Sequence, residues 1–419
     1  PDRRPHTGLL EYKNVHRPAR VVAFSQATGQ ITLRNELDFT NLGEYLSIQY
    51  QITCDGHVIF NGSISELPVI LPHQTGLLSI PIHIPSKGLC FLKLCYLTAD
   101  ASATLPAGHL LGFDELPLLN AEPRYQLSIV VPAFPEPLKV SEDNDHLTVS
   151  GSSFTYTLDR STGLWSSLLL QGVEFLTHPM ELNIWRAPTD NDRNVKATWY
   201  RAQLNRAYAR TYAIVCEKGT DHVQLVCEMG LVAASVQRIA SIRLSWTVFE
   251  TGIIKADLHV VQSPDFPSLP RFGFRMFLPK EMQHVSYFGM GPMESYVDKH
   301  RAASHALYEC SVSALHEDYL RPQENGSHWD CSFVEISNGA NALTVSADKP
   351  FSFNVSQYTQ EELTEKTHNF ELMPCDGTVL CIDYAQADIG SNSCGPTLLP
   401  QYQVPTQPFD FSVTFTPHA

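Results

Sequence analysis

The sequence predicts an all-β protein, and three observations support this prediction. Aromatic residues are abundant, with 21 Phe and 16 Tyr, while charged residues make up only 17% of the 419 residues. Aromatic and β-branched residues suit the pleated, half-buried surface of a sheet. Short runs of alternating apolar and polar residues recur between turn residues, and no fixed-period repeat is visible, so sandwiches are predicted rather than a solenoid.

The first part of the chain, residues 1–118, predicts an immunoglobulin-like β-sandwich. Residues 19–25 and 31–35 are strand-like, and "YLSIQYQITCDGHVIFNG" at 45–62 is a hairpin that turns at Asp55-Gly56. Further strands are predicted at 77–84 and 90–99. About seven short strands in roughly 100 residues is the pattern of such a sandwich.

A Pro-rich stretch at 119–136 predicts a connector, since proline cannot serve a central strand. The remaining residues, 137–419, predict one large second sandwich, with four strands in 146–176 and a last strand at 409–417. Two helices are expected. One spans 195–210 with Asp192 as its cap, and the other spans 359–368 with Thr359 and Glu362 at a capping-box spacing.

Charge and cysteine content limit the function classes. The formal net charge is −15, which argues against binding to a nucleic-acid backbone and suits a neutral partner. No stretch of about 18 apolar residues predicts a membrane span. The ten cysteines lack C-x-x-C spacing, so free thiols, no disulfide and a cytoplasmic location are expected. Since the chain opens with "PDRRPH" and no Met, a fragment is expected.

Residues 183–192, "NIWRAPTDND", gather three acceptor side chains at the end of the run. They could form a calcium site, a catalytic pair or a hydrogen-bonded turn. The register of a calcium loop and its closing glutamate are missing, so a turn is preferred over a calcium site. Similarly, Glu324 and His328 in "RPQENGSHWD" could act as an acid/base pair, but Asn325-Gly326 is a strong turn signal and favours a structural turn.

Several long stretches go beyond composition. In order, "NIWRAPTDND" (183–192), "YFGMGPMESYVDKHRAA" (287–303), "YLRPQENGSHWD" (319–330) and "GSNSCGP" (390–396) resemble the C-terminal domain of lac-type β-galactosidases of glycoside hydrolase family 2. Residues 10–42 resemble the immunoglobulin-like domain that precedes it in that family. The resemblance implies a galactose-mutarotase-like super-sandwich for 137–419.

The resemblance also implies where the chemistry lies. Family members carry both catalytic glutamates, magnesium and sodium on an (α/β)₈ barrel, so no catalytic residue, metal or cofactor is expected in this chain. Two loops are expected at the substrate mouth, with the candidate residues Asp192, Arg193, Asn194, Asn392, Ser393 and Cys394. Cys394 replaces a tryptophan that some members use as an aglycone platform. The turn itself is expected to be held by Arg186, Asp190 and Asn191.

Two function hypotheses follow. The first is a non-catalytic C-terminal part of a retaining β-galactosidase that hydrolyses terminal β-D-galactosides such as lactose. Its partners would be the carbohydrate and the catalytic barrel, in cis or as a separate subunit, within a homo-oligomer, without nucleic acid or membrane. The second is a free-standing carbohydrate-binding or aldose-mutarotase-like module. Mutarotation by the chain alone would separate the second from the first.

Overall fold

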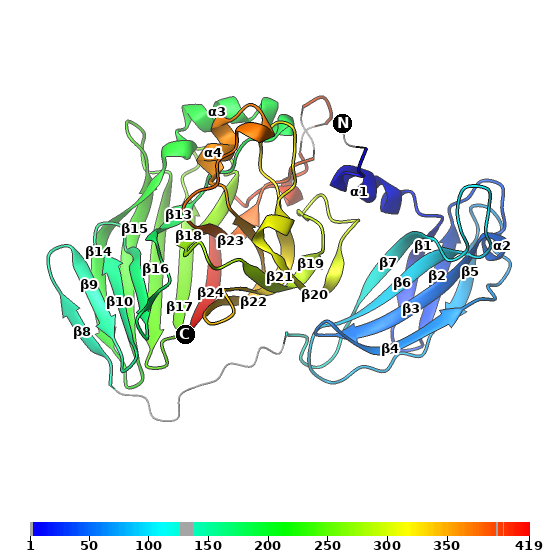
Figure 1. Ribbon diagram of the computed structural model, residues 1–419, viewed down its shortest axis with the longest axis horizontal. Coiled ribbons are helices and arrows are strands. Elements are labelled where there is room, and N and C mark those ends of the chain that lie inside the picture. The colour runs from blue at the N-terminus through cyan, green and yellow to red at the C-terminus, as the bar shows by residue number, and fades with distance from the viewer. Residues whose placement is uncertain (1–2, 126–136, 391–392, 397) are drawn as a thin grey trace. The chain divides into compact units, whose positions relative to one another are not determined.

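The computed structural model describes residues 3–125, 137–390, 393–396 and 398–419 (Figure 1). The chain divides into two compact units, one of residues 1–128 with 300–307 and the other of residues 129–299 with 308–419. The boundaries predicted for the connector, 119–136, stay a prediction, because 126–136 lie outside the described residues.

The first unit is built from two antiparallel sheets. One has the order β1-β2-β5 and the other β4-β3-β6-β7. Apolar residues of both sheets, among them Leu33, Ile48 and Leu92, form one buried core. The elements are α1 (Thr7–Val15), β1 (Ala19–Ser25), β2 (Gln30–Asn35), α2 (Leu42–Tyr45), β3 (Leu46–Cys54), β4 (His57–Ile64), β5 (Thr75–Ser79), β6 (Cys90–Thr98) and β7 (Leu110–Leu118).

The predicted hairpin is confirmed. Strands β3 and β4 pair antiparallel and turn at Asp55 and Gly56, whose φ angles are +49° and +82°. Positive φ at both central residues is what a tight two-residue hairpin turn requires. Strand β5 ends at Ser79, short of the predicted 77–84, because Pro81 lacks an N–H for the ladder. Helix α1 was not among the expected helices.

The second unit contains a five-stranded sheet, β12-β11-β10-β9-β8, and a twelve-stranded sheet, of which only residues 304–307 are grouped with the first unit. The main path of the larger sheet is β13-β18-β23-β22-β24-β17-β16-β15-β14, with antiparallel neighbours throughout. Off this path, β21 pairs with β22, β19 with β21, and β20 with β19. The large core includes Trp165, Trp246 and Phe274. The all-β prediction is confirmed.

The bounds in the second unit follow. The five-stranded sheet comprises β8 (Lys139–Glu142), β9 (His146–Ser150), β10 (Phe154–Asp159), β11 (Leu164–Leu170) and β12 (Val173–Glu174). The large sheet comprises β13 (His178–Asn183), β14 (Tyr208–Lys218), β15 (His222–Val232), β16 (Ala240–Phe249), β17 (Ile254–Gln262), β18 (Arg271–Leu278), β19 (His284–Gly291), β20 (Ser304–Ser311), β21 (Ser327–Ser337), β22 (Ala342–Ser356), β23 (Thr378–Gln386) and β24 (Phe409–His418). Short helices are η1 (Asp190–Arg193), α3 (Lys196–Arg201), η2 (Leu204–Arg206), η3 (Val312–Leu315), α4 (Gln360–Glu365), η4 (Asn369–Glu371) and η5 (Pro400–Tyr402).

The helix prediction for 195–210 was wrong in its length. Helix α3 ends at Arg201, and Gln203 adopts a left-handed φ of +56°, which stops the helix. From Tyr208 the chain joins the sheet as β14, where pairing with β15 outweighs the helical pattern. The second predicted helix is present as α4, and the Thr359 side chain accepts from the Glu362 N–H at 3.1 Å.

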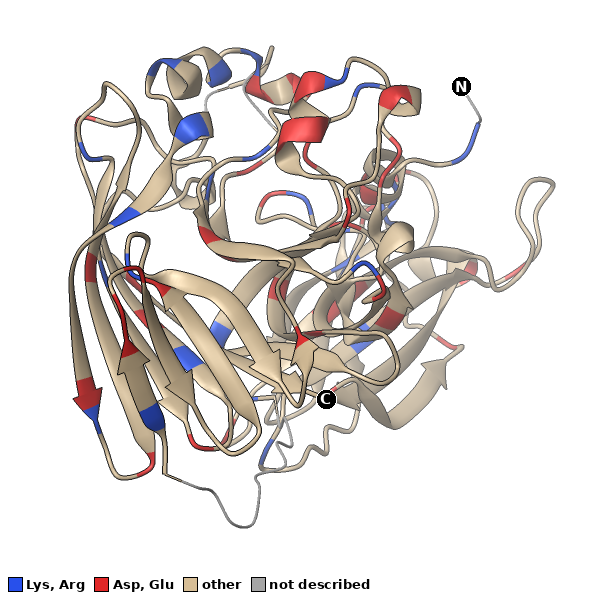
Figure 2. Cartoon of the chain, turned by 60° about the vertical axis from the view of Figure 1, so that its left-hand side comes forward, with Lys and Arg blue, Asp and Glu red and all other residues tan. Residues whose placement is uncertain are grey.

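All ten cysteines are free thiols, and Cys394 is exposed. Within the described residues, no helix has both the length and the apolar content that crossing a bilayer requires. In Figure 2 the basic residues are scattered among acidic ones, in keeping with the formal net charge of −15. Helix α4 itself has Glu361 and Glu362 in its first turn, where the helix dipole favours negative charge.

Candidate functional site

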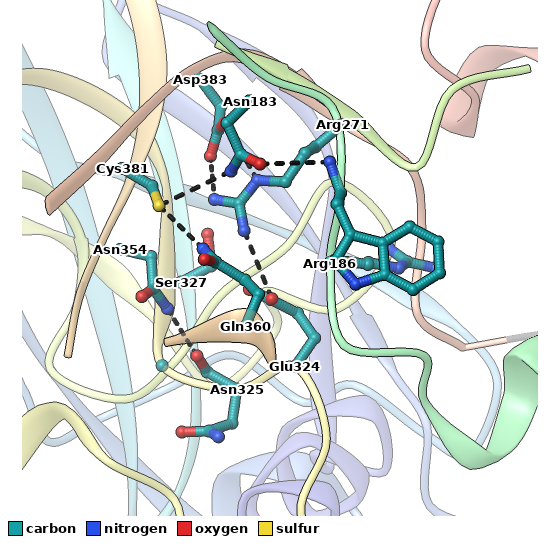
Figure 3. Close-up of polar contacts among 12 residues, drawn as sticks. Asn183, Arg186, Arg271, Glu324, Asn325, Ser327, Asn354, Gln360, Cys381 and Asp383 are labelled. Carbon is teal, nitrogen blue, oxygen red and sulfur yellow. Dashed lines mark hydrogen bonds and ion pairs between the residues drawn. The ribbon is translucent and has the colours of Figure 1, made fainter. Parts of the chain in front are cut away.

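A buried ion-pair cluster lies at the start of β18. Arg271 donates from Nε to Asp383 Oδ1 at 3.0 Å and also binds the second oxygen of the same carboxylate (Figure 3). Its Nη1 donates to Glu324 Oε2 at 3.3 Å. Arg271 and Asp383 are 0% exposed and Glu324 is 3% exposed. Burial alone would lower the pKa of Arg271, but the two carboxylates outweigh burial and hold that pKa well above its usual range.

Amide side chains surround this cluster and connect its strands. Asn183, at the end of β13, donates to Cys381 Sγ at 3.7 Å, and Gln360 of α4 donates to the same sulfur at 2.9 Å (Figure 3). The amide of Asn354 on β22 donates to the carbonyl of Asn325 at 2.5 Å. Buried polar groups cost free energy unless they are paired, so these contacts hold the strands in one arrangement.

Glu294 and His328 lie beside the 324–326 turn. The Glu294 carboxylate accepts from Lys299 Nζ at 2.5 Å and from the Gly326 N–H at 2.9 Å. Burial acts to raise the pKa of Glu294, but Lys299 and its other donors hold that pKa below its usual value. His328 contacts the Met290 carbonyl through Nδ1 at 3.1 Å, and burial lowers its pKa to about 4. His328 is therefore a neutral, buried imidazole near pH 7.

The acceptor-rich run forms a closed turn, which we call the first loop (residues 186–194). Arg186 is 1% exposed and donates to both oxygens of Asp192, at 3.2 Å from Nε and 2.7 Å from Nη2. The Thr189 N–H also donates to Asp192, at 2.8 Å. Thr189 thus stands at the N-cap position of η1, and the Asp192 side chain at N3 satisfies its backbone N–H.

The second loop comprises residues 387–390 and 393–396, and it is bonded to the first. Arg186 donates to the carbonyls of Ala387 and Asp388. Asn191 donates to the Ile389 carbonyl at 2.7 Å and accepts from Ser393 Oγ at 3.1 Å. One arginine and one asparagine therefore hold together two loops that lie about two hundred residues apart in the chain.

Comparison with known proteins gives the family. The family described as "Beta galactosidase small chain" matches residues 150–415. The chain belongs to the β-galactosidase small-chain family. The description "Beta-galactosidase, domain 4" matches residues 31–119 in the first unit. The predicted resemblance to the C-terminal region of a β-galactosidase is confirmed.

Relatives named β-galactosidase match almost the whole chain. The enzyme of Actinobacillus pleuropneumoniae is 41% identical over 409 residues, which cover 96% of this chain and 39% of the relative. The enzyme of Staphylococcus xylosus is 33% identical over 422 residues, covering 98% and 41%. The chain thus spans about two fifths of the length of these relatives. A galactose 1-epimerase from Lactobacillus acidophilus is 10% identical with a TM-score of 0.36, covering 67% of this chain and 98% of that structure.

In this small-chain domain the predicted mouth residues lie in the two loops. Arg193, Asn194 and Cys394 are exposed, and Ser393 is half-buried. Asn392 lies outside the described residues. Asp192, in contrast, is 5% exposed and forms an ion pair with Arg186. The prediction that it caps the helix near Val195 was wrong: α3 has no side-chain cap, because Asp192 faces back into η1.

Asp190 and Asn191 were predicted, with Arg186, to hold the turn. Asp190 is exposed, and its N–H donates to Gln323 Oε1 at 3.0 Å. Asn191 makes the bonds to the second loop described above. Both oxygens of Asp192 and the amide oxygen of Asn191 have protein donors, as a hydrogen-bonded turn requires. The preference for a turn over a calcium site stays a prediction.

The ion-pair cluster of the small-chain domain was not predicted from sequence. Its members are charged residues inside apolar strand runs, Arg271 in "PRFGFRMFL" and Asp383 in "VLCIDYA". A charge at an inward-facing strand position is rare unless it is paired, so each residue alone signals a buried partner. The partner itself cannot be read locally, since Arg271 and Asp383 are separated by 112 positions.

Glycine is expected to be essential at position 326. Gly326 has a φ of +70°, and an added Cβ would lie 2.3 Å from the Leu315 carbonyl oxygen. Gly326→Ala should lower the free energy of unfolding by more than about 2 kcal/mol, since the left-handed backbone alone costs about 1 kcal/mol and the clash adds to it. Urea denaturation of the purified chain measures this.

Gly339→Ala is the matched control. Gly339 has a φ of +87° but nothing within 4 Å of an added Cβ. Gly339→Ala should therefore lower the free energy of unfolding by only about 1 kcal/mol. Equal losses for the two variants would contradict the close approach at Gly326.

Proposed function

We propose that the chain is the C-terminal, non-catalytic region of a retaining β-galactosidase, and that its first and second loops complete the substrate mouth. The enzyme would hydrolyse terminal β-D-galactosides such as lactose in the cytoplasm, as a member of glycoside hydrolase family 2. Support comes from the small-chain match over residues 150–415 and from relatives whose printed name is β-galactosidase.

The single observation behind the mouth role is the bonding between the two loops. Arg186, Asp192 and Asn191 form a rigid base that is buried or half-buried. The exposed side chains of Arg193, Asn194 and Cys394 stand on this base. A preformed edge of this kind lowers the cost of ordering a bound sugar and keeps it oriented for reaction. Cys394 offers a small thiol, so this edge supplies no aromatic platform for an aglycone.

The chemistry itself is proposed to come from a catalytic barrel, in cis or as a partner subunit. Retention needs a nucleophilic carboxylate and an acid/base carboxyl flanking the anomeric centre. In this proposal the barrel carries both, together with magnesium and sodium, and the full enzyme is a homo-oligomer. The four sheet paths of the described residues have antiparallel neighbours, unlike the parallel strands of such a barrel.

The 419-residue chain alone is expected not to hydrolyse a nitrophenyl β-galactoside. Adding a family barrel, by co-expression or in one chain, should restore hydrolysis, because the chain then contributes orientation to chemistry that is present. A chromogenic assay of both preparations measures this. Turnover by the chain alone would sink the proposal, and mutarotation of galactose without hydrolysis would favour a free-standing module.

The mouth role has its own test in the restored enzyme. Arg193→Ala should raise KM more than it lowers kcat, because the side chain would contact substrate and not the reacting bond. Arg243→Ala is the matched control, since this arginine is also exposed but lies on β16. Equal effects of the two variants would contradict a contribution of the first loop.

A further inference from the structure

A cleft of about 250 Å³ lies in the second unit and shares no residue with the two loops. Its walls come from β21, β22 and β23, from residues 296–297, and from residues 401–403 and 405. Five aromatic residues line it: Tyr296 and Phe351 are buried, and Trp329, Tyr384 and Tyr402 are half-buried. The ring of Tyr384 stacks on Phe409, with centroids 4.3 Å apart and an interplanar angle of 7°. This stacking holds Tyr384 in one orientation.

Two β-bulges lie at the strand positions that line the cleft. The register of β21 against β22 shifts between His328 and Cys331, so Trp329 and Asp330 fall in the shift. Asp330 has a left-handed φ of +56°. On β23, Ala385 and Asp383 face consecutive residues of β18, which leaves Tyr384 as the extra residue. Bulges redirect side chains and are over-represented next to functional sites.

Gln386, at the end of β23, is the strongest sign of a ligand. It lines the cleft and is 7% exposed. Both its Nε2 and its Oε1 are buried, and among the described residues neither has a hydrogen-bonding partner. A buried carboxamide without partners costs about 1–3 kcal/mol for each unmet group, so it is retained where a ligand can meet it. That ligand must accept a hydrogen bond from Nε2 and donate one to Oε1.

The other lining groups narrow the ligand class. The cleft offers the amides of Gln401 and Gln403, the hydroxyl of Ser352 and the carboxylate of Asp330. Among the described residues that line it, none is Lys, Arg or His. A phosphate or carboxylate ligand would therefore meet the Asp330 carboxylate and no cationic side chain among these lining residues. Hydroxyl groups fit, because each both donates and accepts, and the aromatic side chains suit the apolar face of a sugar ring.

We propose that this cleft is a saccharide-binding site for a neutral pyranose ring. Gln386 makes a paired donor–acceptor contact with ring hydroxyls once its buried amide turns toward the cleft, and Trp329, Tyr384 and Tyr402 provide the apolar contact. The proposal is independent of the mouth role of the two loops, because it uses none of their residues.

Saturation-transfer NMR on the 419-residue chain tests the proposal. The probes are methyl β-D-galactopyranoside and methyl β-D-glucopyranoside, and sorbitol serves as a polyol without a ring. Transfer is expected from at least one pyranoside and not from sorbitol. Absence of transfer from both pyranosides means that water alone fills the cleft, and it would overturn the proposal. Transfer from sorbitol equal to that from the pyranosides would also overturn it.

Variants locate the binding. Gln386→Leu should weaken pyranoside binding by at least about tenfold through loss of its hydrogen bonds. The melting temperature should stay the same or rise, since an unmet buried amide is removed. Trp329→Phe should weaken binding less than Trp329→Ala, because a ring remains. Gln224→Leu, at a half-buried glutamine on β15, is the control and should leave binding unchanged. Wild-type affinity in Gln386→Leu would overturn the assignment of Gln386.

Discussion

Replacing Arg271 by methionine is expected to lower the free energy of unfolding by about 3–5 kcal/mol, the range for breaking a buried ion pair from one side. Arg271 binds both oxygens of Asp383 and one oxygen of Glu324. Both carboxylates are buried, at 0% and 3% exposure. Methionine preserves much of the volume but leaves Asp383 without its cation and removes one cation from Glu324. Chemical denaturation of the variant and the parent chain measures the difference.

The loss should depend on pH. Burial raises the pKa of Asp383 to about 6 even with Arg271 in place, and removing the cation raises it further. The pKa of Asp383 is thus higher in the folded state than the value of about 3.9 in the unfolded chain, so the folded state binds the proton more tightly. At low pH this difference in proton binding stabilises the folded state. This stabilisation is lost as pH rises through the folded-state pKa. The deficit of Arg271→Met should therefore be smaller at pH 5 than at pH 8.

Two controls make this prediction specific. Arg243 is 63% exposed and its pairing with Glu228 is long, at 3.8 Å, so Arg243→Met should change stability by less than about 0.5 kcal/mol. The double variant Arg271→Met, Asp383→Leu should recover part of the loss, because no Asp383 charge is left unpaired. A deficit in Arg271→Met that is the same at pH 5 and pH 8 would contradict the account.

The fold was largely predictable because strand periodicity is a local property. In β10 buried and less buried positions alternate along the whole strand, and apolar and polar residues alternate in the same way in the sequence. The Asp55-Gly56 hairpin is local as well. The helix predicted for 195–210 was wrong because Tyr208 and the residues after it pair with β15, a contact that no window of sequence shows.

The candidate site also contains contacts that the sequence predicts, because they are local, and contacts that it does not. Arg186 and Asp192 are six positions apart, so their pairing could be expected from sequence. The bonds from Asn191 to Ile389 and Ser393 span about two hundred positions and depend on the order of the strands in the large sheet. The cleft at Gln386 depends on two bulges, and a bulge changes side-chain direction without changing the alternation that a reader of the sequence would use.

Removing Asp192 is the second large effect that the structure predicts. Asp192→Ala leaves the guanidinium of Arg186, at 1% exposure, without its carboxylate, and it also removes the acceptor of the Thr189 N–H. The expected loss is about 3 kcal/mol or more, well above the roughly 1 kcal/mol of a simple cap. Asp192→Asn should lose less, because the amide oxygen can still accept from Thr189. Urea denaturation of the parent chain, Asp192→Ala and Asp192→Asn gives their order of stability.

Hydrogen exchange distinguishes a local cap from a link between two loops. Because Arg186 also donates to the carbonyls of Ala387 and Asp388, releasing it should speed amide exchange in both the first and the second loop. Faster exchange confined to the first loop would mean that Asp192 acts only within its turn. Asp190→Ala is the matched control: this neighbouring carboxylate is exposed, so its loss should cost less than about 0.5 kcal/mol and leave both loops protected.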